Sequence, residues 1–424
     1  MGNLDYTQVL NKIENTRRFG NEPGVVVTAQ VIKVLREKGK QKRIIPYIHV
    51  AGTNGKGSVC AFFSSILKKE HMRVGTFVSP HLVDFEERIT VDGRMIPKED
   101  VTRLGNYLLD IDFGIGLTMF DYCLAMALLY FEEQQCDYMV IETGLGGRLD
   151  STNAIGTPQC AVITKIGYDH MAILGSDIAD IAAEKAGIIK ENGTVVVEQQ
   201  DKRAMQVIEQ EVKKKHARII TVEQSDIARC SGYALRLCGT FQWENAAAAE
   251  LAARYVLGKR YGGPKYEMQY DKTEPKSEKT DLNDRIKSAL EEAVWPGRME
   301  IVSKEPFLLV DGAHNSNGVD ALKESLMQMY PGEKFCFFMG VMADKDYDVM
   351  IREILPLAEE FYTVTPDSDR ALQASHLADF IRKEGVCATE LSGVDEIRKH
   401  LKRDTKNIAF GSLYFIGELK QHRI

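Results

Sequence analysis

The feature that most constrains this chain is a glycine-rich turn between an apolar run and a helical pattern. The turn reads GTNGKGS at residues 52–58, the apolar run covers residues 44–50, and the helical pattern follows over residues 59–67. In a strand, glycine-rich turn and helix of this kind, backbone N–H groups and the helix N-terminus surround phosphate groups. The sequence therefore predicts a phosphate-binding loop in which Lys56 supplies a point charge.

This turn departs from the common phosphate-loop pattern G-x-x-x-x-G-K-[ST] at two positions. Val50 stands where the first glycine is expected, and Gly57 stands where the final Ser or Thr is expected. Ser58 follows one position later, where it could reach a Mg2+ bound to the phosphates. We therefore expect a variant form of the loop.

Length and composition limit the kind of protein. A chain of 424 residues is longer than one ordinary domain, so two domains are expected. The net charge of -7 argues against a nucleic-acid binder, whose footprint is usually basic. The eight cysteines form no C-x-x-C pair, which argues against a zinc site or a disulfide framework. With no signal-like start and no apolar run of membrane length, we expect a cytoplasmic monomer that binds small molecules, with neither nucleic acid nor membrane as a partner.

Strand-like and helix-like segments alternate through the first part of the chain. The expected helices cover residues 5–19, 25–36 and 120–135, and the further strands lie within residues 74–82, 137–142, 160–166 and 194–197. Such alternation is typical of an α/β fold with a doubly wound, mostly parallel sheet. The phosphate loop belongs to this N-terminal domain.

A second α/β alternation follows a hinge-type turn, WPGR at residues 295–298. Its expected strands lie within residues 306–310, 334–341, 360–365 and 407–410. We therefore predict two domains, residues 1–296 and residues 297–424, of which the second is a smaller, Rossmann-like α/β domain. Residues 262–284 are polar with almost no aliphatic side chains, which predicts an exposed insertion or mobile loop.

Polar residues follow two of the expected strands in the first domain. Glu142 ends one strand and is followed by a glycine-rich turn, while Asp169 and His170 follow the next. Ligands of open parallel sheets gather at the carboxyl ends of the strands, and a carboxylate there suits a hard cation such as Mg2+. Each residue alone is more readily explained as structural. The phosphate loop and these two strand ends together nevertheless indicate a site.

The second domain has its own strand-end cluster, DGAHN at residues 311–315. Asp311 could hold ATP or an amine substrate, or it could form an Asx-type turn that caps the next helix; local sequence gives the two about equal weight. Arg298, at the interdomain turn, could clamp phosphates, although a lone arginine there is more often a surface residue.

Seven motifs together resemble the folylpolyglutamate synthase/dihydrofolate synthase family of the Mur ligase superfamily. The resemblance runs from about residue 10 to the C-terminus, and it accounts for the short loop form, which this superfamily uses. In chain order the motifs are GTNGKGS (52–58), SPHL (79–82), ETGLGGRLDSTN (142–153), IGYDH (166–170), EKAGI (184–188), WPGR (295–298) and DGAHN (311–315).

The resemblance implies an ATP-dependent amide ligase. Such enzymes transfer the γ-phosphate of ATP to a substrate carboxylate, and the amine of L-glutamate then attacks the acyl phosphate, releasing ADP and phosphate. Phosphoryl transfer of this kind needs positioning and charge neutralisation more than covalent chemistry from the protein. The implied ATP ligands are Gly52, Thr53, Asn54, Gly55, Lys56, Gly57, Ser58, Asn245, Arg298 and Asp311.

The resemblance also implies a metal site and a modified lysine. Ser79, Glu142 and His170 would bind Mg2+. Lys185 matches the lysine that the family carbamylates, which turns a cation into an anion that can help hold a second metal. Sequence alone would not have singled out Lys185. Lys56, Lys185, His170 and His314 are the predicted catalytic residues.

Substrate residues follow from the same resemblance. Phe120 offers an aromatic face for a pterin ring, although a core aromatic at the start of a helix is the plainer explanation. Asp121 stands where a Glu is commoner, and Lys165 replaces a smaller residue before Ile-Gly. The predicted substrate residues are Thr118, Phe120, Asp121, Leu149, Asp150, Ser151 and, with His314 for glutamate, Ser412.

Three alternatives remain at this point. The LGGRLD turn at residues 145–150 resembles that of bifunctional members, so dihydrofolate synthase could accompany or replace folylpolyglutamate synthase as the main activity. A cell-wall Mur ligase is the runner-up enzyme class, against which the SPHL and DGAHN motifs argue. A non-catalytic nucleotide-binding module would be expected to lack reactive residues such as Lys56 and Glu142, and both are present.

Overall fold

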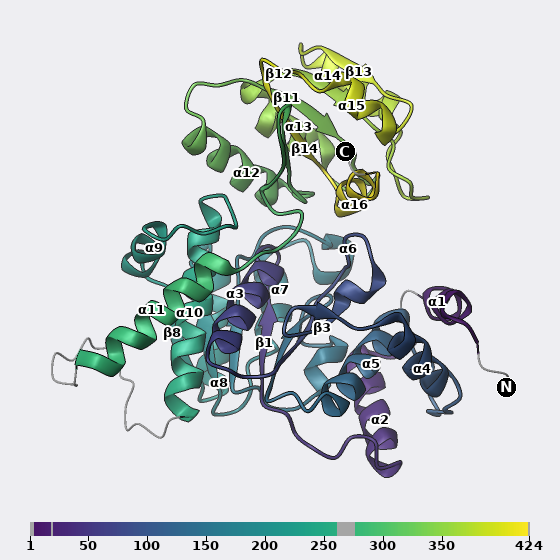
Figure 1. The fold of residues 1–424 in the computed structure, drawn as a ribbon, viewed down its shortest axis with the longest axis vertical. Coiled ribbons are helices and arrows are strands. Elements are labelled where there is room, and N and C mark those ends of the chain that lie inside the picture. The colour runs from purple at the N-terminus through teal and green to yellow at the C-terminus, as the bar shows by residue number, and fades with distance from the viewer. Residues whose placement is uncertain (1–3, 18–19, 261–275, 423–424) are drawn as a thin grey trace. The chain divides into compact units, whose positions relative to one another are not determined.

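The structure, a computed structural model, describes residues 4–17, 20–260 and 276–422. The chain forms two compact units (Figure 1). The first contains Met1–Ala234 and Glu244–Ala293, and the second contains Leu235–Trp243 and Val294–Ile424. The second unit thus includes a short segment that the sequence analysis gave to the first domain. Thr240 of that segment donates from its backbone N–H to Ser325 Oγ at 3.0 Å, within the second unit.

An eight-stranded sheet forms the centre of the first unit, in the order β4-β3-β2-β5-β1-β6-β7-β8. Neighbouring strands run parallel throughout the series β2-β5-β1-β6-β7-β8. At the other edge, β3 pairs antiparallel with β2, and β4 pairs antiparallel with β3. The bounds are β1 (Tyr47–Ala51), β2 (Val74–Phe77), β3 (Ile89–Val91), β4 (Arg94–Met95), β5 (Tyr138–Glu142), β6 (Cys160–Ile163), β7 (Thr194–Val197) and β8 (Arg218–Thr221). The doubly wound, mostly parallel sheet is confirmed, whereas the short edge strands β3, β4 and β8 were not predicted.

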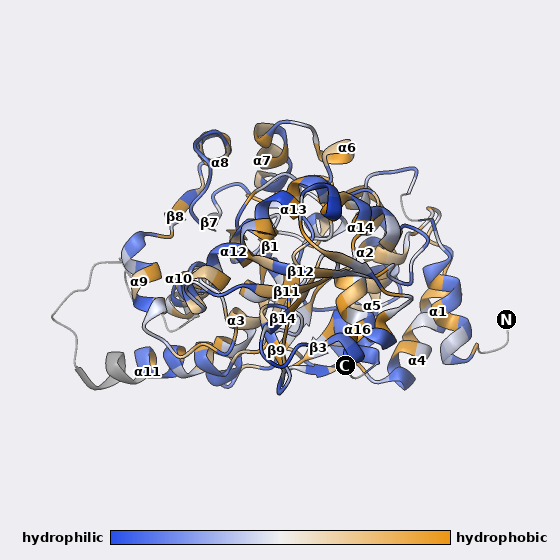
Figure 2. Cartoon of the chain, turned by 90° about the horizontal axis from the view of Figure 1, so that it is seen from above, coloured by the Kyte–Doolittle hydropathy of each residue, from blue (hydrophilic) through white to orange (hydrophobic). Residues whose placement is uncertain are grey.

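Helices flank this sheet. They are α1 (Tyr6–Glu14), α2 (Gly24–Glu37), α3 (Lys56–Lys69), α4 (Lys98–Leu109), α5 (Met119–Glu133), α6 (Met171–Leu174), α7 (Ile178–Ala186), α8 (Lys202–Lys214), α9 (Gln224–Ser231), α10 (Phe241–Arg260) and α11 (Lys276–Glu292). Phe77, Leu124 and Phe131 belong to the core cluster that α1, α2, α4 and α5 cover, and Ile163, Ile181 and Ile208 belong to the cluster beneath α7 and α8. Figure 2 shows hydrophobic and hydrophilic residues on different faces of α1 and α4, as expected for helices on the outside of a sheet.

The polar segment at residues 262–284 is only partly described. Residues 262–275 lie outside the described residues, so the prediction for them is not addressed. Residues 276–284 form the first half of α11, so the prediction of a loop was wrong there. Lysine, glutamate and serine are acceptable helix formers, and α11 gains its fixed position from packing against α3, where Arg285 pairs with the buried Glu70 at 2.6 Å.

The second unit is a smaller α/β sandwich around a six-stranded sheet, ordered β13-β12-β11-β14-β10-β9. Only β9 is antiparallel to its neighbour. The strands are β9 (Glu300–Lys304), β10 (Phe307–Val310), β11 (Phe335–Met339), β12 (Ala358–Thr363), β13 (Ala388–Glu390) and β14 (Lys406–Phe410), and the helices are α12 (Ser316–Met329), α13 (Tyr347–Ile354), α14 (Ala374–Lys383), α15 (Ile397–His400) and α16 (Leu413–Gln421). Its core is aromatic: Phe337 stacks on Phe361 with ring centroids 5.2 Å apart.

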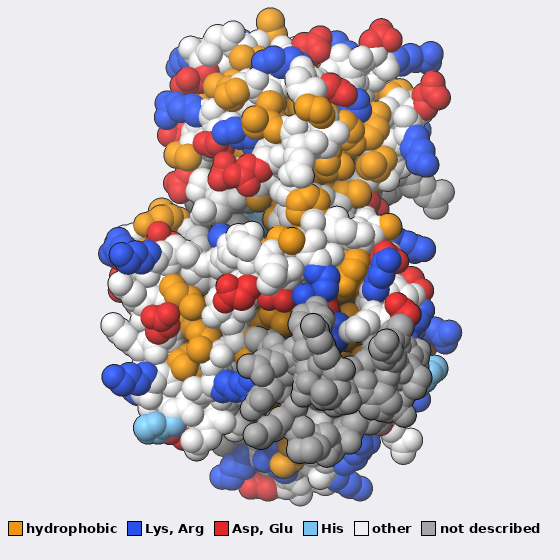
Figure 3. All heavy atoms as spheres, turned by 90° about the vertical axis from the view of Figure 1, so that its left-hand side faces the viewer, with side chains coloured by type: hydrophobic (Ala, Val, Ile, Leu, Met, Phe, Trp, Pro, Cys, Tyr) orange, Lys and Arg blue, Asp and Glu red, His pale blue; other side chains and the backbone are white. Residues whose placement is uncertain are grey.

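Two further observations concern the surface. Among the described residues, no helix is long and apolar enough to cross a membrane. On the face drawn in Figure 3, Lys and Arg side chains are interspersed with Asp and Glu side chains, and hydrophobic groups lie between them. Charge on this face is therefore dispersed rather than gathered by sign.

Candidate active site

The phosphate loop lies between β1 and α3, as predicted. Gly52 and Gly55 both have positive φ angles, +158° and +89°. A Cβ on Gly52 would lie 1.8 Å from Thr164 Oγ1, and one on Gly55 would lie 2.3 Å from Asn245 Oδ1. Side chains are thus excluded at both positions. Asn245, a predicted ATP ligand on α10, is buried directly against the loop.

Residues at the end of β6 hold the loop in shape. The backbone N–H groups of Thr53 and Asn54 both donate to Lys165 O, at 2.9 and 3.2 Å. Thr164 Oγ1 donates to Asn54 O at 2.6 Å, and Thr53 Oγ1 lies 3.0 Å from both the N and the O of Gly167. Thr164 and Lys165 were not predicted to support the loop, because nothing in their local sequence signals a contact more than a hundred residues away.

Lys56 begins α3 and faces the loop itself. Its Nζ donates to Gly52 O at 3.2 Å and to Thr53 O at 3.3 Å, and it lies 3.8 Å from Glu142 Oε1. Gly57 and Ser58 complete the first turn of α3, whose N–H groups have no partners within the helix. An ammonium group and a helix N-terminus together favour an anion at this place.

Two of the predicted metal ligands are neighbours. Glu142, at the carboxyl end of β5, is buried, and its Oε2 accepts the backbone N–H of Ser79 at 3.3 Å. His170 precedes α6 with φ +52°; its side chain is 38% exposed, and its Nε2 lies 3.9 Å from Asp169 Oδ1.

Among the residues that the structure describes, no group of three or more His, Cys, Asp and Glu side chains is arranged to hold a metal. The predicted set has only Glu142 and His170 of these types, so this finding does not decide the prediction. A buried carboxylate beside a serine nevertheless offers the oxygen donors that a hard cation such as Mg2+ prefers.

Lys185, on α7, lies against the back of the phosphate loop. Its side chain is buried, and Nζ donates to Gly52 O at 2.8 Å. Burial and, to a smaller extent, the positive charge of Lys56 lower the pKa of Lys185 to about 7, against the opposing effect of Asp169, Asp150 and Glu184. This amine is therefore partly uncharged near neutral pH, unlike an ordinary lysine.

Three predicted substrate residues form one hydrogen-bonded group. Asp121 Oδ2 accepts from both Thr118 N and Thr118 Oγ1, at 2.9 and 2.6 Å, and its Oδ1 accepts from Ser151 Oγ at 2.6 Å. Asp121 thereby caps α5 and ties it to the turn after β5. The shorter Asp side chain, where Glu was expected from the resemblance, makes these contacts without exposure to solvent.

The other predicted substrate residues of the first unit are Phe120, at the start of α5, and Leu149 and Asp150, in the turn after β5. The Phe120 ring packs against Gly144, where an added Cβ would lie 2.8 Å from the ring. The ring centroids of Phe120 and Phe77 are 5.5 Å apart. Leu149 is 43% exposed. Asp150 is buried and accepts the backbone N–H groups of Gly144 and Leu145 at 3.0 and 2.9 Å. Burial raises the pKa of Asp150, and these donors oppose that rise.

The second unit brings its predicted residues to the carboxyl ends of β10 and β14, which are adjacent and parallel. Asp311 is buried; its Oδ2 accepts Met299 N and its Oδ1 accepts Ala313 N, both at 2.8 Å. A Cβ on Gly312 would lie 2.5 Å from Arg298 Nη1. Arg298 and Asp311 are therefore close neighbours, and burial raises the pKa of Asp311 while the charge of Arg298 opposes the rise.

The remaining polar residues of this unit have evident local roles. His314 Nδ1 lies 2.8 Å from Gly312 O. Asn315 caps α12 by accepting Gly318 N at 2.8 Å, and Ser412 caps α16 by accepting Tyr414 N at 3.1 Å. The Asx-type turn that the sequence offered as the structural explanation of Asp311 is present, since Asp311 Oδ1 accepts the backbone N–H of Ala313. The cap of the next helix, α12, is Asn315 rather than Asp311.

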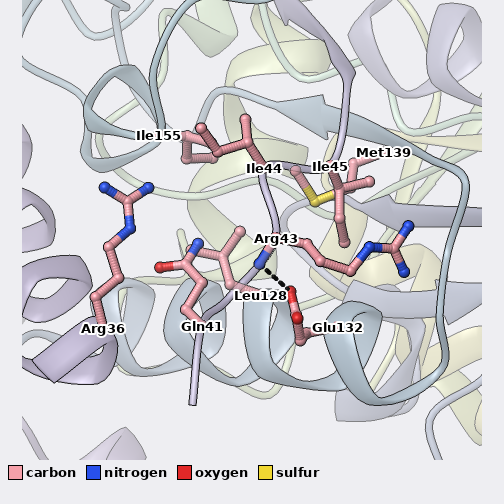
Figure 4. Close-up of a pocket in the computed structure, with 9 residues that line it drawn as sticks. All are labelled: Arg36, Gln41, Arg43, Ile44, Ile45, Leu128, Glu132, Met139 and Ile155. Atoms are coloured by element: carbon pink, nitrogen blue, oxygen red, sulfur yellow. Dashed lines mark hydrogen bonds between the residues drawn. The ribbon is translucent and has the colours of Figure 1, made fainter. Parts of the chain in front are cut away.

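A cavity elsewhere in the first unit is unrelated to these residues (Figure 4). It lies at the amino ends of β1 and β5, the opposite edge from the phosphate loop, and its volume of about 10 Å3 suits no more than a water molecule. Arg43 N donates there to Glu132 Oε2 at 3.3 Å. The lining residues are Arg36, Gln41, Arg43, Ile44, Ile45, Leu128, Glu132, Met139 and Ile155.

Comparison with known protein families identifies both units. The Mur ligase middle domain matches residues 50–253, and the Mur ligase glutamate ligase domain matches residues 297–410. The two matches together span most of the chain, and they begin close to the phosphate loop and close to Arg298.

Several known proteins are similar over nearly the whole chain. The dihydrofolate synthase/folylpolyglutamate synthase of Bacillus subtilis is 33% identical, over 98% of both chains. The folylpolyglutamate synthase of Lacticaseibacillus casei is 30% identical, over 87% of both chains. Among solved structures, E. coli FolC in complex with DHPP and ADP has a TM-score of 0.80 at 26% identity, covering 99% of this chain and 97% of that one.

Proposed function

Because the chain belongs to the folylpolyglutamate synthase/dihydrofolate synthase family of the Mur ligase superfamily, we propose that it joins L-glutamate to the γ-carboxylate of a reduced folate such as tetrahydrofolate. The enzyme is an ATP-dependent acid–amino-acid ligase, and it releases ADP and phosphate. A second activity, which joins dihydropteroate to L-glutamate, is favoured by the B. subtilis relative, since that relative is named for both activities. A cell-wall Mur ligase is not favoured, because the relatives compared above are named for folate enzymes.

One observation in the structure carries this proposal. β1 and β5 are adjacent and parallel, and they deliver the phosphate loop and the turn of residues 143–150 to the same edge of the sheet. Glu142, at the start of that turn, lies 3.8 Å from Lys56 of the loop. A phosphate donor on the loop and a carboxylate substrate on the turn would meet at this point.

The chemistry has two steps. A carboxylate oxygen of the folate attacks the γ-phosphorus, and the bond from phosphorus to the ADP oxygen breaks. The glutamate amine then attacks the carbonyl carbon of the acyl phosphate, phosphate leaves with the electrons of the C–O bond, and the amine loses a proton. Lys56 and the N–H groups of residues 52–58 would bind and orient the phosphates, where they neutralise developing negative charge.

Mg2+ fits the residues at the end of β5. Glu142 supplies carboxylate oxygens, and Ser79, whose backbone N–H donates to Glu142 Oε2, carries a hydroxyl group as a second oxygen donor; we propose His170 as the third ligand. The ion would supply positive charge to the phosphate oxygens as they transfer. Glu142 would hold the Mg2+ ion close to Lys56 of the phosphate loop.

Carbamylation of Lys185 is part of the proposal. An amine reacts with CO2 only in its uncharged form, and a pKa of about 7 makes that form abundant at neutral pH. The product carries a negative charge where the ammonium was, and it releases one proton. That anion would then be available to the metal and to the phosphate loop, since Lys185 already reaches Gly52 O.

The folate would bind along the turn after β5. Thr118, Asp121 and Ser151 present a connected polar group, Phe120 presents an aromatic ring, and Leu149 presents an exposed apolar side chain. Such a mixture suits a heterocycle with polar edges. The Asp150 side chain faces the inside of this turn, because it accepts the backbone N–H groups of Gly144, Leu145 and Thr152.

The second unit would contribute Arg298 and Asp311 as ATP ligands and His314 and Ser412 to glutamate binding. The support for these roles is the family resemblance together with the neighbouring positions of Arg298 and Asp311. His314, which we propose as catalytic, has one ring nitrogen beside Gly312 O, so the orientation of its ring is fixed. We further propose a monomer located in the cytoplasm.

The deciding experiment measures ADP release with L-glutamate and either tetrahydrofolate or dihydropteroate. We expect release that depends on both ATP and the folate, and the product should be heavier than the substrate by one glutamyl residue. Release that needs neither pterin would refute the folate assignment. Release with dihydropteroate as well would establish the second activity.

A further inference from the structure

Three buried side chains of the first unit form a chain of hydrogen bonds behind the turn after β5. His49, in the middle of β1, is fully buried, and its Nε2 lies 2.7 Å from Thr152 Oγ1. Thr152, which is also fully buried, bonds through the same Oγ1 to Asp150 Oδ1. Asp150 Oδ2 in turn accepts the backbone N–H groups of Gly144 and Leu145. These hydrogen bonds therefore connect β1, the strand before the phosphate loop, to the turn that follows β5.

The direction of these hydrogen bonds follows from counting protons. Three backbone N–H groups, of Gly144, Leu145 and Thr152, point at the Asp150 carboxyl and can only donate. The Thr152 hydroxyl has one proton and can act as donor to only one of its two neighbours. If Asp150 is ionised, that proton goes to Asp150, and His49 must donate to Thr152 from Nε2.

The opposite direction would require a protonated Asp150 that donates to Thr152, which would then donate to His49 Nε2. The ring proton would have to sit on His49 Nδ1, which is buried and has no hydrogen-bond partner. A buried N–H without an acceptor is rarer in proteins than an unpaired acceptor. An Asp150 that already accepts three N–H groups also disfavours the acid form. Both arguments select the first direction.

The charges around His49 agree with a neutral ring. Burial and, to a smaller extent, the nearby ammonium of Lys190 together lower the pKa of His49 to about 3. Lys190 donates to Asn153 O at 2.9 Å, on the segment that carries Thr152. The ring centroids of His49 and Tyr47 are 6.1 Å apart. The ring thus stays neutral in the pH range where proteins are active.

We propose that His49, as its neutral Nε2–H tautomer, is a positioning residue for the folate-binding turn. It donates to Thr152, which directs its own proton to Asp150, and Asp150 then fixes Gly144 and Leu145 in the turn. The role of the turn in folate binding rests on the function proposed above, whereas the tautomer does not. The neighbouring residue Ser151 bonds to Asp121, so a displaced Thr152 would also disturb that contact.

The tautomer can be tested on the unaltered protein by nitrogen NMR of its histidine rings. The signal that disappears in His49→Gln identifies the ring. We expect a proton on Nε2, none on Nδ1, and no titration through the region of about pH 6.5 where an ordinary histidine changes charge. A proton on Nδ1, or a ring that titrates there, would overturn the proposal. No substrate is needed, so this outcome is separate from that of the folate assay.

The positioning role is tested with two variants of similar size. His49→Leu removes the donor, whereas His49→Gln places an amide N–H where Nε2 stood. Loss of one hydrogen bond to a buried acceptor should raise the KM for folate about tenfold in His49→Leu, with a smaller change in the KM for ATP. His49→Gln should recover most of the loss. Equal effects on both KM values, or no recovery by Gln, would show that His49 is merely part of the core.

If His49→Leu fails to fold, His49→Gln and the NMR result still decide the proposal. A wild-type KM for folate in His49→Gln, together with a proton on Nε2 of His49 in the unaltered protein, would support it, whereas a raised KM in His49→Gln or a proton on Nδ1 in the unaltered protein would overturn it. If the unaltered protein uses neither tetrahydrofolate nor dihydropteroate, the proposed function fails and the positioning role fails with it, while the NMR result still fixes the direction of the hydrogen bonds.

Discussion

Both units bury polar residues, but these residues bond to different kinds of partner. In the second unit, Asp311, Asn315 and Ser412 each accept a backbone N–H two or three residues further along the chain. In the first unit, Lys185 donates to Gly52 O, 133 residues away, and His49 contacts Thr152, 103 residues away. One set forms local turns and caps, and the other joins distant elements.

This difference affects how strongly each set indicates function. A turn or helix cap is a sufficient reason for Asp, Asn or Ser at the start of a helix, so the second unit's residues would be explained without a ligand. No such reason accounts for the buried amine of Lys185 or for Glu142 beside Lys56. Buried ionisable groups with displaced pKa values gather at functional sites. Asp311 shares this property, but Lys185 has it without a local turn to explain the residue, so the first unit gives the stronger structural evidence.

The largest expected effect is on Lys56→Ala. Lys56 contacts only the loop carbonyls and lies near Glu142, so its removal should leave stability almost unchanged while lowering kcat by about a thousandfold, the scale for one lost electrostatic contact in a transition state. Steady-state kinetics and urea unfolding measure the two quantities. Lys68→Ala, on the exposed part of the same helix, is the matched control and should alter neither. Normal turnover in Lys56→Ala would mean that the loop does not bind the reacting phosphate.

A smaller effect, and on a different quantity, is expected for Asp311→Asn. The amide retains one acceptor but turns its NH2 toward Met299 N or Ala313 N, so the second unit should lose about 1–3 kcal/mol of unfolding free energy. Asn315→Ala, which removes only the cap of α12, should lose about 1 kcal/mol and serves for comparison. Unchanged stability with lost turnover in Asp311→Asn would remove the contrast between the two units.

The smallest expected effect is the pH dependence that Lys185 imposes. Its pKa is about 7 in the folded protein against 10.5 for an ordinary lysine, so between these values the unfolded chain binds a proton that the folded chain does not. Stability should therefore rise with pH in this window, by at most about 1.4 kcal/mol per pH unit, and fall as the pH drops toward 7. Urea unfolding in buffer free of CO2 measures the slope, and Lys185→Met should reduce it.

Added bicarbonate provides the second part of the Lys185 test. With 13C-labelled bicarbonate, a carbamate signal should grow from acid to mildly alkaline pH as the amine loses its proton. That signal should be absent in Lys185→Met. A wild-type protein without the signal, but with full turnover, would show that the modification is not required.

Much of the first unit was predictable because its signals are local. The phosphate loop needs glycines at residues 52 and 55, because side chains there would collide with Thr164 and Asn245. Both glycines belong to one motif of seven consecutive residues, 52–58. Strands β1, β5, β6 and β7 are short apolar runs, as expected for strands buried on both faces. The site residues in other elements, including Asn245 and Lys185, came instead from the resemblance to a family.

The sequence by itself determined the α/β class, the phosphate loop and the strand-end position of Glu142, since each depends on neighbours along the chain. Tertiary structure decided the rest. It placed residues 235–243 with the second unit, made residues 276–284 the first half of α11, and brought Lys185 behind the loop. It also gave His49 a partner at Thr152. Burial and distant partners set the charge state and the pairing of these side chains, and neither leaves a periodic signal in the sequence.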